Sequence, residues 1–319
     1  MFIKQAFNVK HEFWRYIVGS LIVIAASIVG QFPLLGAIIW KGVQDGGDAF
    51  ASLDESAIYS MLESNLFLFL MLISFLAAFG GLYLAVKYLH GQTMTSIATS
   101  RPKLDWKRIW FAFIFWGVIS SGMIVLDYLY LSPDDYLWNF EWKRFAILLV
   151  IAVALIPFQT SLEEYLFRGY LMQGFGMLAK NRWFPLLMTS LIFGGLHIAN
   201  PEVGKLGYSI MIYYIGTGLF LGIMTLMDEG TELALGFHAA NNLFTALLVT
   251  ADWTAFQTHS VLKDVSEPTL ELMDMVVPVF VMFPIILFIF SKKYKWTNWK
   301  EKLFGRIEEP PKEDYKIIE

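Results

Sequence analysis

Long apolar runs alternate with short polar loops along this chain. An α-helix rises 1.5 Å per residue, so about 20 apolar residues are needed to cross a hydrocarbon core about 30 Å thick. Eight segments meet or approach this length, and their residue ranges are about 16–40, 65–89, 109–131, 145–175, 185–199, 207–227, 232–250 and 274–291. The pattern therefore predicts an all-α, polytopic transmembrane helical bundle of about eight spans. The first apolar run is too long for the core of a signal peptide, and we expect it to be a retained span.

The composition agrees with a chain whose main solvent is the lipid bilayer. Hydrophobic residues make up 56% of the 319 residues and charged residues 16%, whereas soluble domains carry about a quarter charged residues. The net charge of −4 is small and gives no reason to expect a nucleic-acid partner. The absence of cysteine from the sequence excludes disulfides and thiolate metal sites, which leaves histidine and carboxylates as the strong metal ligands.

Lysine and arginine are distributed unevenly between the loops. In an eight-span arrangement one side receives most of them: Lys4, Lys10, Arg15, Arg101, Lys103, Lys107, Arg108, Arg168, Lys180, Arg182, Lys292, Lys293, Lys295, Lys300 and Lys302. Basic loops stay in the cytoplasm, so both termini are predicted to be cytoplasmic. The acidic residues Asp228, Glu229 and Glu232 fit this side poorly, although acidic residues count little in the rule.

The chain shows no internal repeat and no linker between domains. We expect an N-terminal part with three transmembrane helices (1–144), a part with four helices that carries the chemistry (145–250), and a last helix with a basic cytoplasmic tail (251–319). Gly216, Gly218 and Gly222 give the sixth span a small-residue face that a neighbouring helix can approach closely.

Polar residues inside the apolar segments form three sets with a four-residue spacing. They are Glu163, Glu164 and Arg168; Phe193 and His197; and His238 and Asn242. Residues four apart stack on one helix face. A charged side chain at the bilayer centre costs roughly 2.5–3.5 kcal/mol on insertion scales, so such residues indicate function by default.

The first set predicts a carboxylate for proton chemistry beside an ion pair. Glu164 and Arg168 are one turn apart and can pair, and this pair is equally compatible with a structural role. Glu163 is rotated by about 100° from Glu164 and need not share that partner. Glu163 is therefore the carboxylate available to deprotonate water.

The other two sets supply imidazoles and an amide. His197 follows two glycines, and His238 lies one turn before Asn242, for which Asn241 is an alternative. Two imidazoles, an amide and a carboxylate from three helices make a hydrolytic cluster, and their depths favour a cavity open to the cytoplasm. The imidazoles and the amide either hold the developing oxyanion or bind a metal; a zinc site would use Glu163, His197 and His238.

In this order, the motifs Glu163-Glu164-x-x-x-Arg168, Phe193-x-x-x-His197 and His238-x-x-x-Asn242 resemble the signature of the CPBP intramembrane proteases. This group includes the CAAX prenyl proteases and the lysostaphin-resistance and bacteriocin-processing proteins. The resemblance covers about residues 145–250. It implies an eight-helix membrane protease whose residues have these roles: Glu163 activates water, His197 positions it, His238 and Asn242 stabilise the oxyanion, Glu164 and Arg168 support the site, and Phe193 lines the cavity. The family has been described both as metal-dependent and as glutamate-dependent, and the sequence leaves this open.

Other interpretations remain alongside the protease. Taken singly, each histidine of the three sets is more typical of a packed core residue, and His11, His90 and His259, at span ends or in loops, are expected to be solvated. Buried carboxylates and histidines also mark proton-coupled transporters. A non-catalytic immunity or scaffold protein is a further alternative. The expected substrate of a protease is a membrane-associated protein or peptide, either prenylated or of the leader type.

Overall fold

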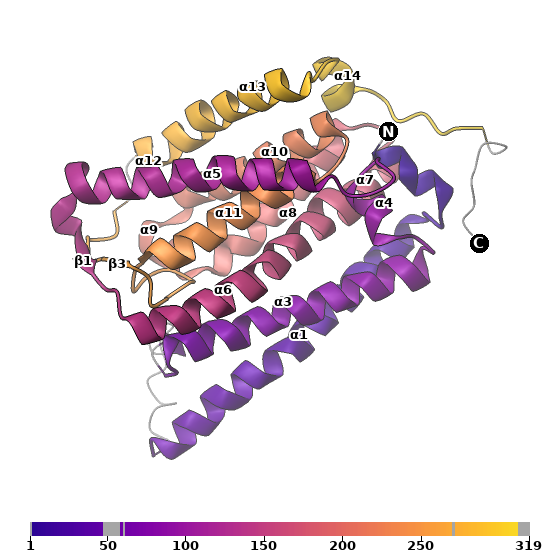
Figure 1. Ribbon diagram of the computed structural model, residues 1–319. Coiled ribbons are helices and arrows are strands. Elements are labelled where there is room, and N and C mark those ends of the chain that lie inside the picture. Colours follow the sequence, from indigo (N-terminus) through magenta and orange to yellow (C-terminus); the bar gives the residue numbers. More distant parts are fainter. Residues whose placement is uncertain (1, 47–57, 60, 270–271, 312–319) are drawn as a thin grey trace.

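The computed structural model describes residues 2–46, 58–59, 61–269 and 272–311, which form a bundle of roughly aligned helices (Figure 1). The helices, in chain order, are α1 (Phe13–Gln44), α3 (Ser64–Leu84), α4 (Met94–Ala98), α5 (Trp106–Leu126), α6 (Trp142–Glu163), α7 (Met172–Ala179), α8 (Trp183–Leu196), α9 (Pro201–Leu206), α10 (Met211–Asp228), α11 (Glu232–Leu248), α12 (Leu272–Val276), α13 (Phe283–Tyr294) and α14 (Trp299–Phe304). Several of them continue in π-helical turns, namely Ala85–Leu89, Asp127–Leu131, Glu164–Leu171 and Val277–Met282.

Each of the eight predicted spans coincides with a helix. Among the described residues, six helical stretches are long and apolar enough to cross a membrane: Phe13–Gln44, Ser64–Leu89, Trp106–Leu131, Trp142–Ala179, Tyr208–Asp228 and Met273–Tyr294. The other two predicted spans are the shorter helices α8, with 14 residues, and α11, with 17. The chain is therefore an integral, multi-pass membrane protein, and eight crossings stay a prediction.

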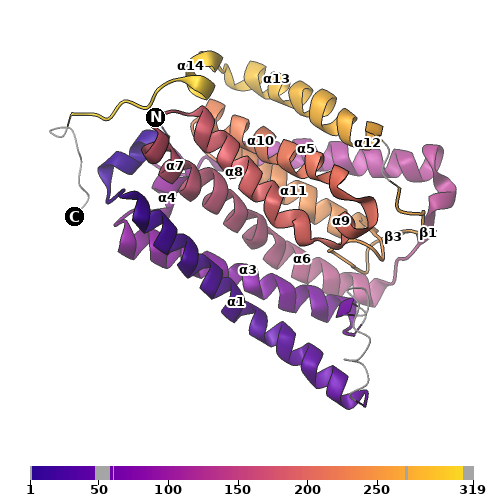
Figure 2. The ribbon, with the colours of Figure 1, turned by 180° about the vertical axis from the view of Figure 1, so that it is seen from behind.

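Helix α11 lies inside the bundle, whereas α1 lies at its edge beside α3 (Figures 1 and 2). Every residue from 231 to 240 is buried. Trp116 of α5 stacks on Phe237 of α11 with ring centroids 4.5 Å apart, and the two helices make extensive contact. By contrast, α1 exposes large apolar side chains such as Ile24 and Phe32, as expected for a surface in contact with lipid. The bundle thus surrounds α11 with helices on several sides.

The predicted small-residue face of the sixth span is confirmed. A Cβ atom on Gly218 would lie 2.9 Å from the Cα of Ser190, and one on Gly216 would lie 2.7 Å from a methyl carbon of Val279. Larger side chains at these positions would push neighbouring helices away, so the glycines allow α8 to pack closely on α10.

A small sheet that the hydropathy pattern did not predict lies at one end of the bundle. It contains β1 (Tyr136–Trp138), β2 (Val249–Thr250) and β3 (Leu262–Asp264) in the order β1-β3-β2. Strand β3 is antiparallel to β1 and parallel to β2. Strands of two or three residues are too short to show an alternating pattern, which explains why they escape detection in the sequence.

The predicted basic segments gather at the opposite end of the bundle, where the N-terminus, α4, α7 and α14 lie near one another (Figures 1 and 2). A β-bridge joins Asn181 to Arg306, and another joins Thr99 to Gly230. The grouping agrees with the predicted threading of the chain. That this end faces the cytoplasm stays a prediction.

Two of the three acidic residues that fitted this basic end poorly, Asp228 and Glu232, are buried partners of its arginines, whereas the half-buried Glu229 lies 3.7 Å from Lys302. Arg101 Nη2 lies 3.2 Å from Asp228 Oδ2, and its Nη1 lies 3.1 Å from Glu232 Oε2. Arg108 Nη1 contacts Asp228 Oδ1 at 2.6 Å. Asp228 and Glu232 thus neutralise local arginines, so their presence at a basic end is explained by ion pairing within the bundle.

The expectation of a solvated His90 was wrong. His90 is 1% exposed, its Nδ1 lies 2.6 Å from the Lys10 carbonyl oxygen, and its Nε2 lies 2.9 Å from the Tyr170 hydroxyl. Burial lowers the pKa of His90, because removal from water disfavours the charged imidazolium. A position at the end of a span therefore does not imply exposure when neighbouring segments fold over it.

Candidate active site

A cavity of about 90 Å³ collects side chains from α6, α8, α10 and α11. Its lining residues are Gln159, Glu163, Phe193, His197, Tyr213, Tyr214, Thr217, Leu221, Phe237, His238, Asn241 and Asn242. Five of the residues that the sequence singled out thus line one space. The remaining two, Glu164 and Arg168, lie behind His238 and reach the cavity through it.

Glu163 lines this cavity, and one of its two carboxylate oxygens is held by a hydrogen bond. It is the last residue of α6, and the π-helical turns begin at the next residue. Oε1 accepts a hydrogen bond from Gln159 Nε2 at 2.6 Å. Oε2 is buried, makes no hydrogen bond with any described residue, and lies 3.5 Å from His238 Nε2. A carboxylate that lines a cavity and has an unengaged oxygen can accept a proton from water.

Glu164 connects Arg168 to His238. Arg168 Nη1 donates to Glu164 Oε1 at 3.0 Å, which confirms the predicted ion pair, and both residues are fully buried. The same oxygen lies 2.7 Å from His238 Nδ1. The sequence did not predict this contact, because the two residues are 74 positions apart in the chain. Because a carboxylate only accepts, Nδ1 is the donor and Nε2 is the nitrogen left for the cavity.

His197 is oriented by its own helix end and by a neighbouring ring. Helix α8 ends at the preceding residue, and His197 Nδ1 donates to the Phe193 carbonyl oxygen at 2.7 Å. Its ring stacks on Tyr214 of α10, with centroids 4.4 Å apart and planes at 27°. The sequence missed Tyr214, because a tyrosine is inconspicuous in a chain with 14 of them and 28 phenylalanines. In the neutral ring, Nε2 is therefore an acceptor for a cavity water.

Asn241 and Asn242, which the sequence could not separate, both line the cavity, and Asn242 is the one bonded to α6. Asn242 Nδ2 donates to Gln159 Oε1 at 3.0 Å, which leaves its second N–H available. The sequence missed Gln159, although its four-residue spacing from Glu163 was a usable signal. One amide N–H in the cavity provides a donor for a developing oxyanion.

The three expected zinc ligands do not form a metal site. Among the residues that the structure describes, no group of three or more His, Cys, Asp or Glu side chains is placed to hold a metal ion. Glu163 and His238 are adjacent, but His238 Nδ1 is engaged by Glu164, and His197 does not complete a set of ligands. The arrangement of the described residues thus gives no support to a metalloprotease.

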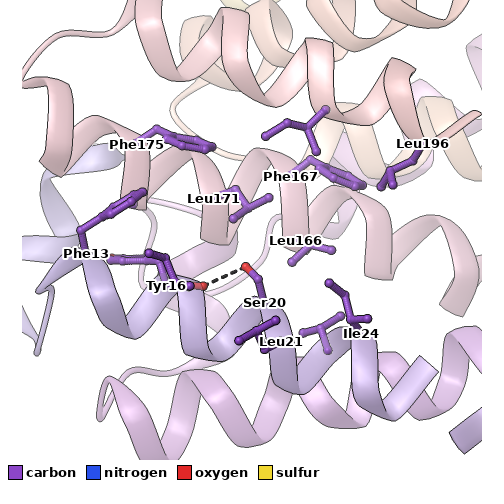
Figure 3. A pocket seen from close by; sticks show the side chains of 14 residues that line it. Phe13, Tyr16, Ser20, Leu21, Ile24, Leu166, Phe167, Leu171, Phe175 and Leu196 are labelled. Atoms are coloured by element: carbon purple, nitrogen blue, oxygen red, sulfur yellow. Dashed lines mark hydrogen bonds between the residues drawn. The ribbon is translucent and has the colours of Figure 1, made fainter. Parts of the chain in front are cut away.

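A second, apolar cavity of about 370 Å³ lies between α1, the π-helical segment with α7, and α8 (Figure 3). Side chains of α1, including Ser20 and Ile24, face Leu166 and Leu171 across it (Figure 3). Phe167 lines this cavity and packs edge-on against Phe193, which lines the first one, with centroids 5.5 Å apart. An aromatic pair therefore separates the apolar cavity from the polar one.

Comparison with known proteins gives two matches. A family model described as "Type II CAAX prenyl endopeptidase Rce1-like" matches residues 141–244, which include every residue of the three motifs. An uncharacterised protein of Bacillus subtilis (strain 168), YyaK, is 34% identical over 242 residues, which cover 76% of this chain and 79% of YyaK. No solved structure matches the chain.

Proposed function

We propose that this chain, which belongs to the CPBP intramembrane protease family, hydrolyses a peptide bond of a membrane-associated substrate with Glu163 as the general base. The observation that supports this most is Glu163 Oε2, which has no hydrogen-bond partner among the described residues, belongs to a side chain that lines the cavity and lies 3.5 Å from His238 Nε2. A water molecule between these atoms would donate one hydrogen to each. Its lone pair would then be directed toward a substrate carbonyl carbon.

The reaction follows from the hydrogen-bonding capacity of these residues. Glu163 takes a proton as the water oxygen bonds to the carbonyl carbon, which gives a tetrahedral oxyanion. The unengaged N–H of Asn242 stabilises that oxyanion, an interaction typically worth about 10²- to 10³-fold in rate. Glu163 then returns the proton to the amine as the C–N bond breaks. His238, whose Nδ1 proton is donated to Glu164, accepts the second hydrogen of the water at Nε2. His197, whose Nδ1 proton is donated to the Phe193 carbonyl oxygen, lines the same cavity and offers a further acceptor there.

Cleavage in isotopically labelled water tests this chemistry. Purified protein in liposomes should cleave a membrane-anchored peptide in H₂¹⁸O and place one ¹⁸O atom in the new carboxylate, as mass spectrometry would detect. Protein stripped of metal by a chelator should keep its rate, because no described group of side chains is placed to hold a metal. Loss of activity that zinc restores would show that the proposed chemistry is wrong. Solute flux without cleavage would indicate a carrier.

The apolar cavity supports a lipid-modified substrate. It adjoins the catalytic cavity across Phe167 and Phe193, so a hydrocarbon chain seated there would place an attached peptide beside Glu163. The name of the matching family model mentions CAAX prenyl endopeptidase activity. We therefore propose a prenylated peptide as the substrate class.

Ser20→Phe should reduce cleavage of a prenylated peptide by about tenfold or more in kcat/KM. The added ring fills part of the apolar cavity. If it excludes only two methylene groups of the prenyl chain, the substrate loses roughly 1.6 kcal/mol of binding free energy. Cleavage of the same peptide without lipid should not change. Ala25→Phe, at an exposed position of α1 outside the cavity, is the matched control. Equal cleavage of the prenylated peptide by both variants would contradict this substrate assignment.

A further inference from the structure

Four hydrogen bonds connect α5 to Glu163 through three side-chain amides. The donors and acceptors, in order, are Trp116 Nε1 to Asn241 Oδ1 (3.0 Å), Asn241 Nδ2 to Asn242 Oδ1 (3.2 Å), Asn242 Nδ2 to Gln159 Oε1 (3.0 Å) and Gln159 Nε2 to Glu163 Oε1 (2.6 Å). We name this series the amide chain. It runs through three helices, α5, α11 and α6, and it ends on the carboxylate that the proposed mechanism uses.

The two ends of the amide chain determine its direction. The indole of Trp116 has an N–H and no acceptor, whereas an ionised carboxylate accepts and has no proton to donate. An amide can satisfy both neighbours in only one of its two orientations. Reversing any of the three amides would place two donors or two acceptors opposite each other, so every dipole points its N–H toward Glu163.

Tight packing holds both the first donor and the last one. Trp116 is 5% exposed and stacks on Phe237 with planes at 25°, so its N–H cannot turn to another partner without losing this contact. Gln159 is 4% exposed and is bonded at both ends of its amide. Aligned dipoles in a buried site polarise one another and strengthen the bond to the terminal acceptor.

We propose that Gln159, oriented by Asn242, Asn241 and Trp116, is a positioning residue that keeps Glu163 ionised and directs its reactive oxygen. The proposal rests on the proposed function of Glu163 as base. The Gln159 N–H stabilises the carboxylate and occupies Oε1, which leaves Oε2 as the proton acceptor in the cavity. The other titratable groups that face this site belong to three elements: His238 on α11, His197 at the end of α8, Tyr213 and Tyr214 on α10, with the Glu164–Arg168 pair behind His238. The short hydrogen bond from the Gln159 amide to Glu163 stabilises the anion without adding a charge.

The pH dependence of kcat/KM for the prenylated peptide tests this role. Gln159→Met keeps the length of the side chain but removes its donor, so the acidic limb of the profile should move to higher pH by about one unit. This shift corresponds to about tenfold lower activity at a pH below the midpoint, with recovery on the alkaline side. Trp116→Phe removes the first donor while keeping an aromatic ring, and it should move the limb in the same direction by less.

Two controls separate positioning from stability. Gln173→Met removes a buried glutamine that bonds Gln92 and Ser96 outside the site, and Trp110→Phe alters an exposed tryptophan of α5. Neither should move the acidic limb. If Gln159→Met lowers activity equally at every pH, or leaves the profile unchanged, the positioning role is wrong even though Glu163 can still be the base. If Gln159→Met does not fold, an unchanged limb in Trp116→Phe has the same meaning.

Discussion

Glu163→Gln is expected to reduce kcat/KM for peptide cleavage by about 10²- to 10⁴-fold, the usual contribution of a general base. The amide has nearly the same shape as the carboxylate but cannot take a proton from water. Its oxygen can still accept from Gln159, so the contact that holds this side chain is retained. The measurement is the initial rate of cleavage of a prenylated peptide in liposomes, together with the thermal unfolding midpoint of the same preparation. A folded variant without activity is the expected result.

Glu63→Gln is the matched control for that experiment. Glu63 caps the N-terminus of α3, lies largely exposed and pairs with His259 at the end of the bundle. The substitution removes a carboxylate of the same type far from the cavity and should change the rate by less than about twofold, since surface ion pairs contribute little. If Glu163→Gln cleaves as fast as the Glu63 variant, Glu163 is not the base and the proposed mechanism fails.

The sequence was sufficient for the spans because the physics that sets them is local. Apolar length decides where a helix can cross a bilayer, and each expected span coincides with a helix. The ion pair between Glu164 and Arg168 could also be predicted from the sequence, since both residues lie on one helix face. Contacts within one turn of a helix can therefore be predicted from spacing alone.

Contacts between different helices could not be predicted from residue spacing. Residue spacing does not predict that Glu164 also holds His238, or that Tyr214 stacks on His197, because these partners are distant in the chain and their contact depends on how the helices are rotated. His90 was misjudged for a related reason, since Lys10 and Tyr170 come from segments that fold over it. Spacing identifies which residues share a face, and only packing decides what that face meets.

The position of α11 explains why the polar residues can work inside a membrane protein. Its residues from 231 to 240 are all buried, so His238 meets protein groups and not lipid. Ionisable residues in spans are tolerated where they face the bundle interior and pair with one another. The carboxylates of Glu163 and Glu164 satisfy this condition through Gln159, Arg168 and His238. The catalytic proposal and the stability of the bundle thus depend on the same contacts.

Arg168→Met is expected to destabilise the fold by about 3–5 kcal/mol, because it leaves a buried carboxylate without its cation. Glu164 and Arg168 are both fully buried, and Arg168 also contacts the Phe193 ring, with its Cζ atom 4.2 Å from the centroid. The measurement is the free energy of unfolding in detergent. Glu164→Gln combined with Arg168→Met removes both charges and should recover part of the loss, at the cost of a charged acceptor for His238.

Arg144→Met provides the comparison, because Arg144 forms an ion pair with Glu141 that is more than half exposed on both sides. The same chemical change should have little effect there, since water screens the remaining charge. Equal stabilities for the Arg168 and Arg144 variants would show that the buried pair is not needed for folding. If Arg168→Met is stable but cleaves more slowly, the ion pair serves to orient His238. In that case the protein folds without the cation, and the loss of activity comes from a Glu164 side chain that no longer holds His238 in place.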